Sequence, residues 1–193
     1  MRPVETPFAV LCQIVRALEA QGISYVVVGS FASLMRGLYR TTNNIDIVAD
    51  IKPSQIEPLV AALQADFHLD EQAVRHAVKQ RREFNAIHFD SVFKIDVFIP
   101  PAGDFSQQQL ARRQAEKISP DVAQEIYVAT AEDTILAKLK WYRAGGEVST
   151  TQWRDVLGMI GTQGNLLDVM YLREWADKLN VRELLEKALA EPA

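Results

Sequence analysis

The hydrophobic positions in the first 128 residues follow the spacing of helices and strands in turn. Phe8, Leu11 and Leu18 lie on one stripe of a helix that should end near Gly22. The β-branched run "SYVVVG" is typical of a strand buried on both faces. Next we expect a short helix at 31–38 and a strand at "IDIVADI". Two helices should follow, one at "SQIEPLVAALQADF", with Pro58 in an early turn or at a kink, and one at "EQAVRHAVKQRR". The alternating runs "FNAIHFD" and "FKIDVFI", joined by Asp90-Ser91, predict a β-hairpin.

From about Thr130 onward the pattern is helical only. The capping-box patterns "TAED" and "STTQ" predict helices that open at Thr130 and Ser149, and "NLLD" predicts a third helix near Asn165. The segment "AGGE" separates the first two helices. We therefore expect an α/β (α+β) protein with an α/β core at 1–128 and a helical region at 129–193.

Composition limits the class of protein without naming it. The chain has 193 residues, 48% of them hydrophobic and 24% charged, as in an ordinary globular domain. A net charge of −4 argues against a broad nucleic-acid surface. The single cysteine, Cys12, cannot form an internal disulfide, so a reducing compartment, the cytoplasm, is expected. No stretch reaches transmembrane length, and no membrane association is expected.

Polar residues stand at the ends of two predicted strands. Gly29 follows the buried run and lets the backbone approach a ligand, while Ser30 offers a hydroxyl at a helix start. Asn44 and Asp46 are two apart on a strand, so both project from one face. Asp96 lies between Ile and Val in "FKIDVFI", where burial is costly without compensation. A magnesium ion with substrate phosphates would compensate all three positions.

This set of motifs resembles the nucleotidyltransferase superfamily of DNA polymerase beta. The family signature is a hydrophobic residue followed by Gly-Gly or Gly-Ser, about a dozen residues, and then two acids that alternate with hydrophobic residues. In this chain 13 residues separate Gly29-Ser30 from "NID", and "RTTNNIDIV" resembles the wording of minimal bacterial members. The C-terminal "ATAEDTILAKLKWYR" and "QWRDV" resemble the toxin-type branch of abortive-infection (AbiE) toxin–antitoxin pairs. The resemblance covers most of the chain.

The resemblance implies a mixed sheet flanked by helices and a metal-dependent reaction. A nucleoside monophosphate would pass from an NTP to a hydroxyl of RNA, protein or a small molecule, releasing pyrophosphate. Gly29 and Ser30 would hold the β- and γ-phosphates, and Asn44, Asp46 and Asp96 would be the Mg²⁺ positions. Asp46 and Asp96 would be catalytic, the latter by helping to activate the acceptor hydroxyl. An antitoxin would be a possible partner. By itself, a Gly-Ser pair is more often an ordinary strand-to-helix turn, and the joint spacing with Asp46 and Asp96 favours the superfamily site.

In the toxin-type branch a helix lysine and an aspartate of an Arg-Asp pair also belong to the catalytic site, and Lys138 and Asp155 match them. The spacing supports their pairing independently. Lys138 lies six residues before the turn at 144–147 and Asp155 eight residues after it, so an antiparallel helix hairpin would set them at a similar level. A buried interhelical salt bridge would explain the pair equally well.

Asn44 departs from the family pattern, in which this position holds aspartate. Asparagine can ligate magnesium but brings no charge, and the loss of one charge about 4 Å from a cation costs on the order of a few kcal/mol at an effective dielectric of about 20. The alternatives are a replaced aspartate, or a weakened nucleotide- or partner-binding module of the same fold.

Two further groups of residues are interpreted as structural. The basic stretch from Arg75 to Arg82 is expected to be a solvated face rather than an acceptor-binding patch. Trp141, Trp153 and Trp175 lie on helical stripes and are expected in the core.

Overall fold

The computed structural model describes residues 6–38, 44–119 and 122–191. Within these ranges the strands are β1 (Tyr25–Val28), β2 (Asn44–Ala49), β3 (Phe67–His68), β4 (Glu83–His88), β5 (Lys94–Phe98), β6 (Gln114–Ser119) and β7 (Val122–Val128). They form one mixed sheet in the order β3-β4-β5-β2-β1-β7-β6. β2 runs parallel to β5, and β1 runs parallel to β7, whereas the other neighbours are antiparallel. The expected mixed sheet flanked by helices is confirmed.

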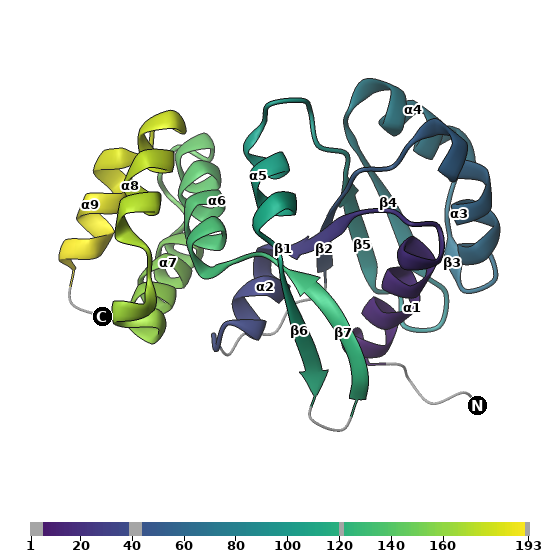
Figure 1. Ribbon diagram of the computed structural model, residues 1–193, viewed down its shortest axis with the longest axis horizontal. Helices are drawn as coiled ribbons and strands as arrows, with labels where there is room; N and C mark the ends of the chain where they lie inside the picture. The colour runs from purple at the N-terminus through teal and green to yellow at the C-terminus, as the bar shows by residue number, and fades with distance from the viewer. Residues whose placement is uncertain (1–5, 39–43, 120–121, 192–193) are drawn as a thin grey trace.

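The helices flank this sheet and then form a separate group. They are α1 (Pro7–Ala20), α2 (Gly29–Met35), α3 (Ile56–Leu63), α4 (Glu71–Gln80), α5 (Phe105–Arg112), α6 (Ala131–Ala144), α7 (Thr150–Gln163), α8 (Val169–Lys178) and α9 (Arg182–Ala190), with 3₁₀ turns at Pro53–Gln55 and Gly164–Leu166. Figure 1 shows α6 to α9 gathered at one side of the molecule and α1, α3 and α4 at the other side of the sheet. None of the helices in the described ranges combines the length and the hydropathy needed to span a membrane.

Two hydrophobic clusters underlie this arrangement. The first contains the buried residues of the sheet and of α1, α3 and α4, including the fully buried Val26 and Val27 of β1. The second is built from α6 to α9 and takes Phe105 from α5. The chain passes from the sheet to the helical group between Val128 and Ala131. Each half therefore buries its own apolar residues, and α5 packs between them.

Local sequence signals account for most of the helix ends. Thr130 and Ser149 cap α6 and α7 as expected, and each hydroxyl accepts the backbone N–H three residues further on. Pro58 is the third residue of α3, an early turn where its missing N–H costs little. The expectation of a helix start at Asn165 was wrong. Asn165 lies in a 3₁₀ turn, and Asp168 caps α8 because its carboxylate accepts a backbone N–H of that helix at 3.0 Å.

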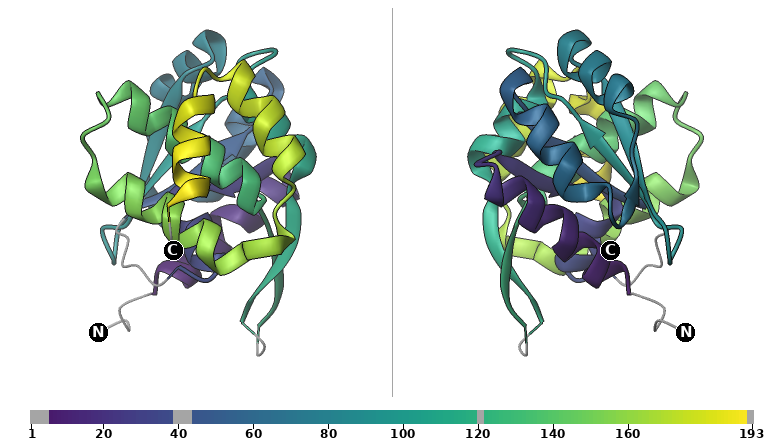
Figure 2. Two further views of the ribbon diagram at one scale, coloured as in Figure 1. Left: turned by 90° about the vertical axis from the view of Figure 1, so that its left-hand side faces the viewer. Right: turned by 90° about the vertical axis from the view of Figure 1, so that its right-hand side faces the viewer.

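The hairpin of β6 and β7 was not predicted. β6 lies at the edge of the sheet, and its "QAEKIS" is largely polar, so it lacks the apolar alternation of a half-buried strand. Figures 1 and 2 show the two strands projecting from the body of the molecule. The first part of the "RTTNNIDIV" motif, residues 40–43, lies outside the described residues.

Candidate functional site

A cleft of about 860 Å³ lies where the sheet faces α5, α6 and α7. It contains four of the residues that the sequence singled out: Gly29, Ser30, Asp46 and Lys138. The remaining lining residues are Val28, Val48, Arg81, Arg82, Glu83, Phe98, Ile99, Pro100, Pro101, Asp104, Phe105, Ser106, Gln109, Thr134, Ala137, Lys140, Trp141 and Gln152. Segments from both halves of the chain thus build one concave site of the size that small ligands use.

Gly29 is pressed against the carboxylate of Asp46. Antiparallel pairing of β1 with β2 places Val28 opposite Asp46, so the residue after Val28 meets the Asp46 side chain. Gly29 has a φ of +66°, and a Cβ there would lie 2.1 Å from Asp46 Oδ2. Only glycine satisfies both conditions. The close backbone approach that the sequence suggested toward a ligand is therefore made, in this structure, toward Asp46.

Asp96 lies beside Asp46 on the neighbouring strand. Parallel β2 and β5 pair Asp46 with Asp96 and Asn44 with Lys94, so the alternation of the strands puts these four side chains on one face. Lys94 Nζ lies 2.7 Å from Asp96 Oδ1, and the Asp96 side chain is 14% exposed. Asn44 is exposed at the start of β2. Neither Asn44 nor Asp96 lines the cleft itself.

The donors on these two strands suit a magnesium ion. Two carboxylates and an amide oxygen are hard oxygen ligands of the kind Mg²⁺ takes together with water and substrate phosphate. No group of three or more acidic, histidine or cysteine side chains with metal-binding geometry occurs in the described ranges, so Asn44 would have to complete the set. In this structure the Lys94 ammonium supplies positive charge to Asp96. A bound cation would take over that role.

Lys138 and Asp155 meet as the spacing predicted. Lys138 Nζ, on α6, lies 2.7 Å from Asp155 Oδ2 on α7. The two side chains are 5% and 12% exposed, so this is a largely buried ion pair. Lys138 also lines the cleft. Lys138 therefore both forms a buried salt bridge between α6 and α7 and borders the candidate site.

Trp141 was expected in the core and instead stands in the cleft. It is 63% exposed. On α6 it continues the face of Thr134, Ala137 and Lys138, at helical spacings of three and four residues, and all four line the cleft. The opposite face, with the fully buried Leu139, fills the helical core. Trp153 and Trp175 are half-buried against that same core.

The basic side chains of the stretch from Arg75 to Arg82 are exposed, as expected, and the end of the stretch also borders the cleft. Arg75 does pair with Glu71 on the surface. Arg81 and Arg82 are exposed as well, and both line the cleft. Arg81 is held there by hydrogen bonds to Asp50 Oδ1 and to a backbone carbonyl, both at 3.2 Å. The cleft is lined by four cationic side chains, those of Arg81, Arg82, Lys138 and Lys140, and by three acids, Asp46, Glu83 and Asp104. The cationic side chains can bind an anionic ligand.

A buried acid anchors α6 behind the cleft. Asp133, in the first turn of α6, is fully buried. Burial raises the pKa of Asp133, and the hydrogen bond from the Tyr171 hydroxyl and the charge of Arg112 only partly oppose this. The Arg112 guanidinium lies 3.7 Å from the centre of the Tyr171 ring and 3.7 Å from Asp133 Oδ2. This cluster links α5, α6 and α8 and so helps to position the wall that carries Lys138.

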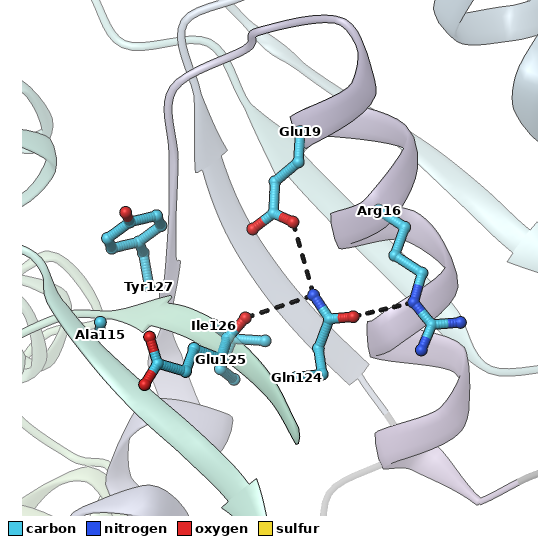
Figure 3. Close-up of a pocket in the computed structure, with 7 residues that line it drawn as sticks. All are labelled: Arg16, Glu19, Ala115, Gln124, Glu125, Ile126 and Tyr127. Atoms are coloured by element: carbon cyan, nitrogen blue, oxygen red, sulfur yellow. Dashed lines mark hydrogen bonds between the residues drawn. The ribbon is translucent and has the colours of Figure 1, made fainter. Parts of the chain in front are cut away.

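A second, more open pocket of about 590 Å³ lies between α1 and the β6–β7 hairpin. Three of its polar side chains, those of Arg16, Glu19 and Gln124, are joined by hydrogen bonds, as Figure 3 shows. Gln124 accepts a hydrogen bond from Arg16 at 2.8 Å and donates one to Glu19 at 3.4 Å. None of the residues singled out from the sequence lines it. These three side chains serve the contact between α1 and the hairpin, and the larger cleft is the candidate site.

Comparison with solved structures supports the fold. A nucleotidyltransferase-like protein from Paracoccidioides brasiliensis superposes with a TM-score of 0.56 at 17% identity, covering 93% of this chain and 90% of that one. ANT(2'')-Ia in complex with adenylyl-2''-tobramycin superposes with a TM-score of 0.52 at 14% identity, covering 90% of this chain and 97% of that one. No protein-family model matches the sequence, and no curated protein matches it. The fold is thus that of nucleotidyltransferases, at identities that show the fold alone.

Proposed function

We propose that this protein transfers a nucleoside monophosphate from an NTP to a hydroxyl group in the cleft. The observation that carries the proposal is the meeting of Gly29, Ser30, Asp46 and Lys138 in one cavity, with Asp96 in register beside Asp46. Gly29, Ser30 and Asp46 match positions of the nucleotidyltransferase signature, and Asp96 matches its third carboxylate. Lys138 matches the helix lysine of the toxin-type branch. The shared fold supports the same assignment.

The chemistry assigns a role to each residue. The acceptor oxygen attacks the α-phosphorus, the bond to the β-phosphate breaks, and pyrophosphate leaves. Ser30 and Lys138 bind the β- and γ-phosphate oxygens, and Asp96 accepts the proton of the attacking hydroxyl. Asn44, Asp46 and Asp96 would hold Mg²⁺, which would neutralise phosphate charge and polarise the phosphoryl group when bound. Asp155 is a positioning residue, because it holds the Lys138 ammonium at 2.7 Å.

Two observations bear on the identity of the acceptor, and they favour different classes of molecule. ANT(2'')-Ia is described in complex with adenylyl-2''-tobramycin, which favours a small hydroxyl compound. The C-terminal resemblance to AbiE-type toxins favours RNA or protein and would make an antitoxin the partner in the cytoplasm. Expression of the protein in a bacterial host separates these roles. A toxin slows growth, and Asp46→Ala abolishes the effect.

A transfer assay tests the proposal. The protein is incubated with Mg²⁺, α-labelled NTP and separate RNA, protein and small-molecule fractions of a cell extract. We expect label in one fraction, lost in Asp46→Ala, and a higher melting temperature with Mg-NTP because ligands of the native state stabilise it. Absence of both label and thermal shift at millimolar nucleotide would refute the proposal.

A weakened binding module is the second candidate, and Asn44 favours it because the metal site then has two charges instead of three. Lys94 on Asp96 favours it as well, since a bound metal must compete with that ammonium. This alternative predicts a thermal shift with nucleotide and no transfer to any fraction.

A further inference from the structure

Trp141 is a large apolar side chain that stays exposed to solvent, which is unfavourable for its free energy. It is 63% exposed, yet it lines the same cleft as Ser30 and Lys138. On α6 it follows Lys138 by three residues, a rise of about 4.5 Å along one face. An indole that borders a concave site offers a flat apolar surface to a planar ring. The Lys138 ammonium and the Trp141 indole are therefore neighbours on α6. A nucleotide could place its phosphates at the ammonium and its base on the indole.

Gln152 stands across from Trp141 on the next helix. The contact of Lys138 with Asp155 fixes the register of the antiparallel α6–α7 pair. A step of three residues forward on α6 and three back on α7 brings Trp141 level with Gln152, and both line the cleft. Gln152 Oε1 is buried and has no hydrogen-bond partner among the described residues. A buried acceptor without a partner is unfavourable, and an N–H of a ligand would satisfy it.

We propose that Trp141 and Gln152 form the nucleobase subsite of the cleft, an inference that rests on the proposed function. The indole stacks on the base, and Gln152 Oε1 accepts a hydrogen bond from an exocyclic amino group. Stacking itself tolerates every base, because each has a π-face. The hydrogen bond then favours adenine, cytosine and guanine, each of which carries an exocyclic amino group on its pairing edge, over uracil, which has carbonyl oxygens and no amino group.

Calorimetric titration of the full chain with ATP, UTP and inorganic tripolyphosphate tests the stacking. Trp141→Ala should weaken both nucleotides about ten-fold, the lower part of the range for one stacked base. Tripolyphosphate has no base, so its affinity should stay unchanged. Trp141→Phe should restore most of the nucleotide affinity. Val148→Ala, at a 78% exposed residue in the turn between the same two helices, is the matched control and should change nothing.

The second arm tests Gln152. The unmodified protein should bind ATP more tightly than UTP, and Gln152→Leu should remove that difference by weakening ATP. Equal binding of ATP and UTP, or unchanged ATP affinity in Gln152→Leu, would overturn the amino-group assignment. Unchanged nucleotide affinity in Trp141→Ala, or an equal loss for tripolyphosphate, would overturn the stacking. If the unmodified protein binds neither nucleotide nor tripolyphosphate, the proposed function itself fails.

Discussion

Replacing Gly29 by alanine should damage this protein far more than the loss of one glycine usually does. Two costs add at this residue. A φ of +66° is left-handed backbone, which costs a residue with a Cβ about 1 kcal/mol. The new Cβ would also lie 2.1 Å from Asp46 Oδ2 and 2.9 Å from Asp46 Cγ, so the carboxylate or strand β2 must move, as in an overpacked core at about 2 kcal/mol.

The sum of about 3 kcal/mol predicts a melting temperature lower by about 6–12 °C for a domain of this size. Gly22→Ala separates the two costs. Gly22 has a φ of +63°, nearly the same as Gly29, but a Cβ at Gly22 would have nothing within 4 Å of it. Only the backbone cost of about 1 kcal/mol remains there, a shift of about 2–4 °C. Thermal unfolding followed by circular dichroism measures both variants.

A double variant identifies the obstructing group. Asp46→Ala removes the two closest atoms and leaves only Asp46 Cβ, which would lie 3.2 Å from the new methyl. Gly29→Ala with Asp46→Ala should therefore melt above Gly29→Ala alone, with a coupling free energy of about 2 kcal/mol. If Gly29→Ala melts like Gly22→Ala, or if the double variant is the sum of the single ones, the packing of Gly29 on Asp46 is wrong.

Three further changes test the rest of the site. Lys138→Met leaves the buried Asp155 carboxylate without its partner, so it should lower the free energy of unfolding by about 3 kcal/mol and remove most of the NTP affinity. Lys140→Met, at a lysine that is 48% exposed, should lower the free energy of unfolding by less than about 1 kcal/mol. Urea unfolding measures both variants, and equal costs would contradict the buried pair. Asn44→Asp should tighten Mg²⁺ at least about ten-fold in calorimetric titration, and an unchanged affinity would place residue 44 outside the metal site. Because burial raises the pKa of Asp133, its contribution to stability is present below about pH 4 and is lost as pH rises through the folded-state pKa. Asp133→Asn should flatten that decline when urea unfolding is measured at increasing pH above about 4, and a decline of unchanged slope would contradict it.

Much of the local structure could be predicted from the sequence because its signals act over a few residues. The hydroxyls of Thr130 and Ser149 cap helices through the backbone N–H three positions later, and the run "YVVV" forms a strand that is buried along its whole length. The meeting of Lys138 with Asp155 could also be predicted, because a short turn between two antiparallel helices brings residues at similar distances from it to a similar level.

The sequence could not predict which residues pack against each other across the molecule, because these contacts join distant parts of the chain. The pairing of β1 with β2 decides that Gly29 meets Asp46, and the pairing of β2 with β5 brings Asp96 beside it. The helical spacing of residues predicts which side chains share a face of the helix, but it does not predict which other residues cover that face. The face of α6 with Trp141 looks into a cleft because the core of the helical group takes the opposite face. The burial of a side chain is a property of its neighbours, and only the tertiary structure supplies them.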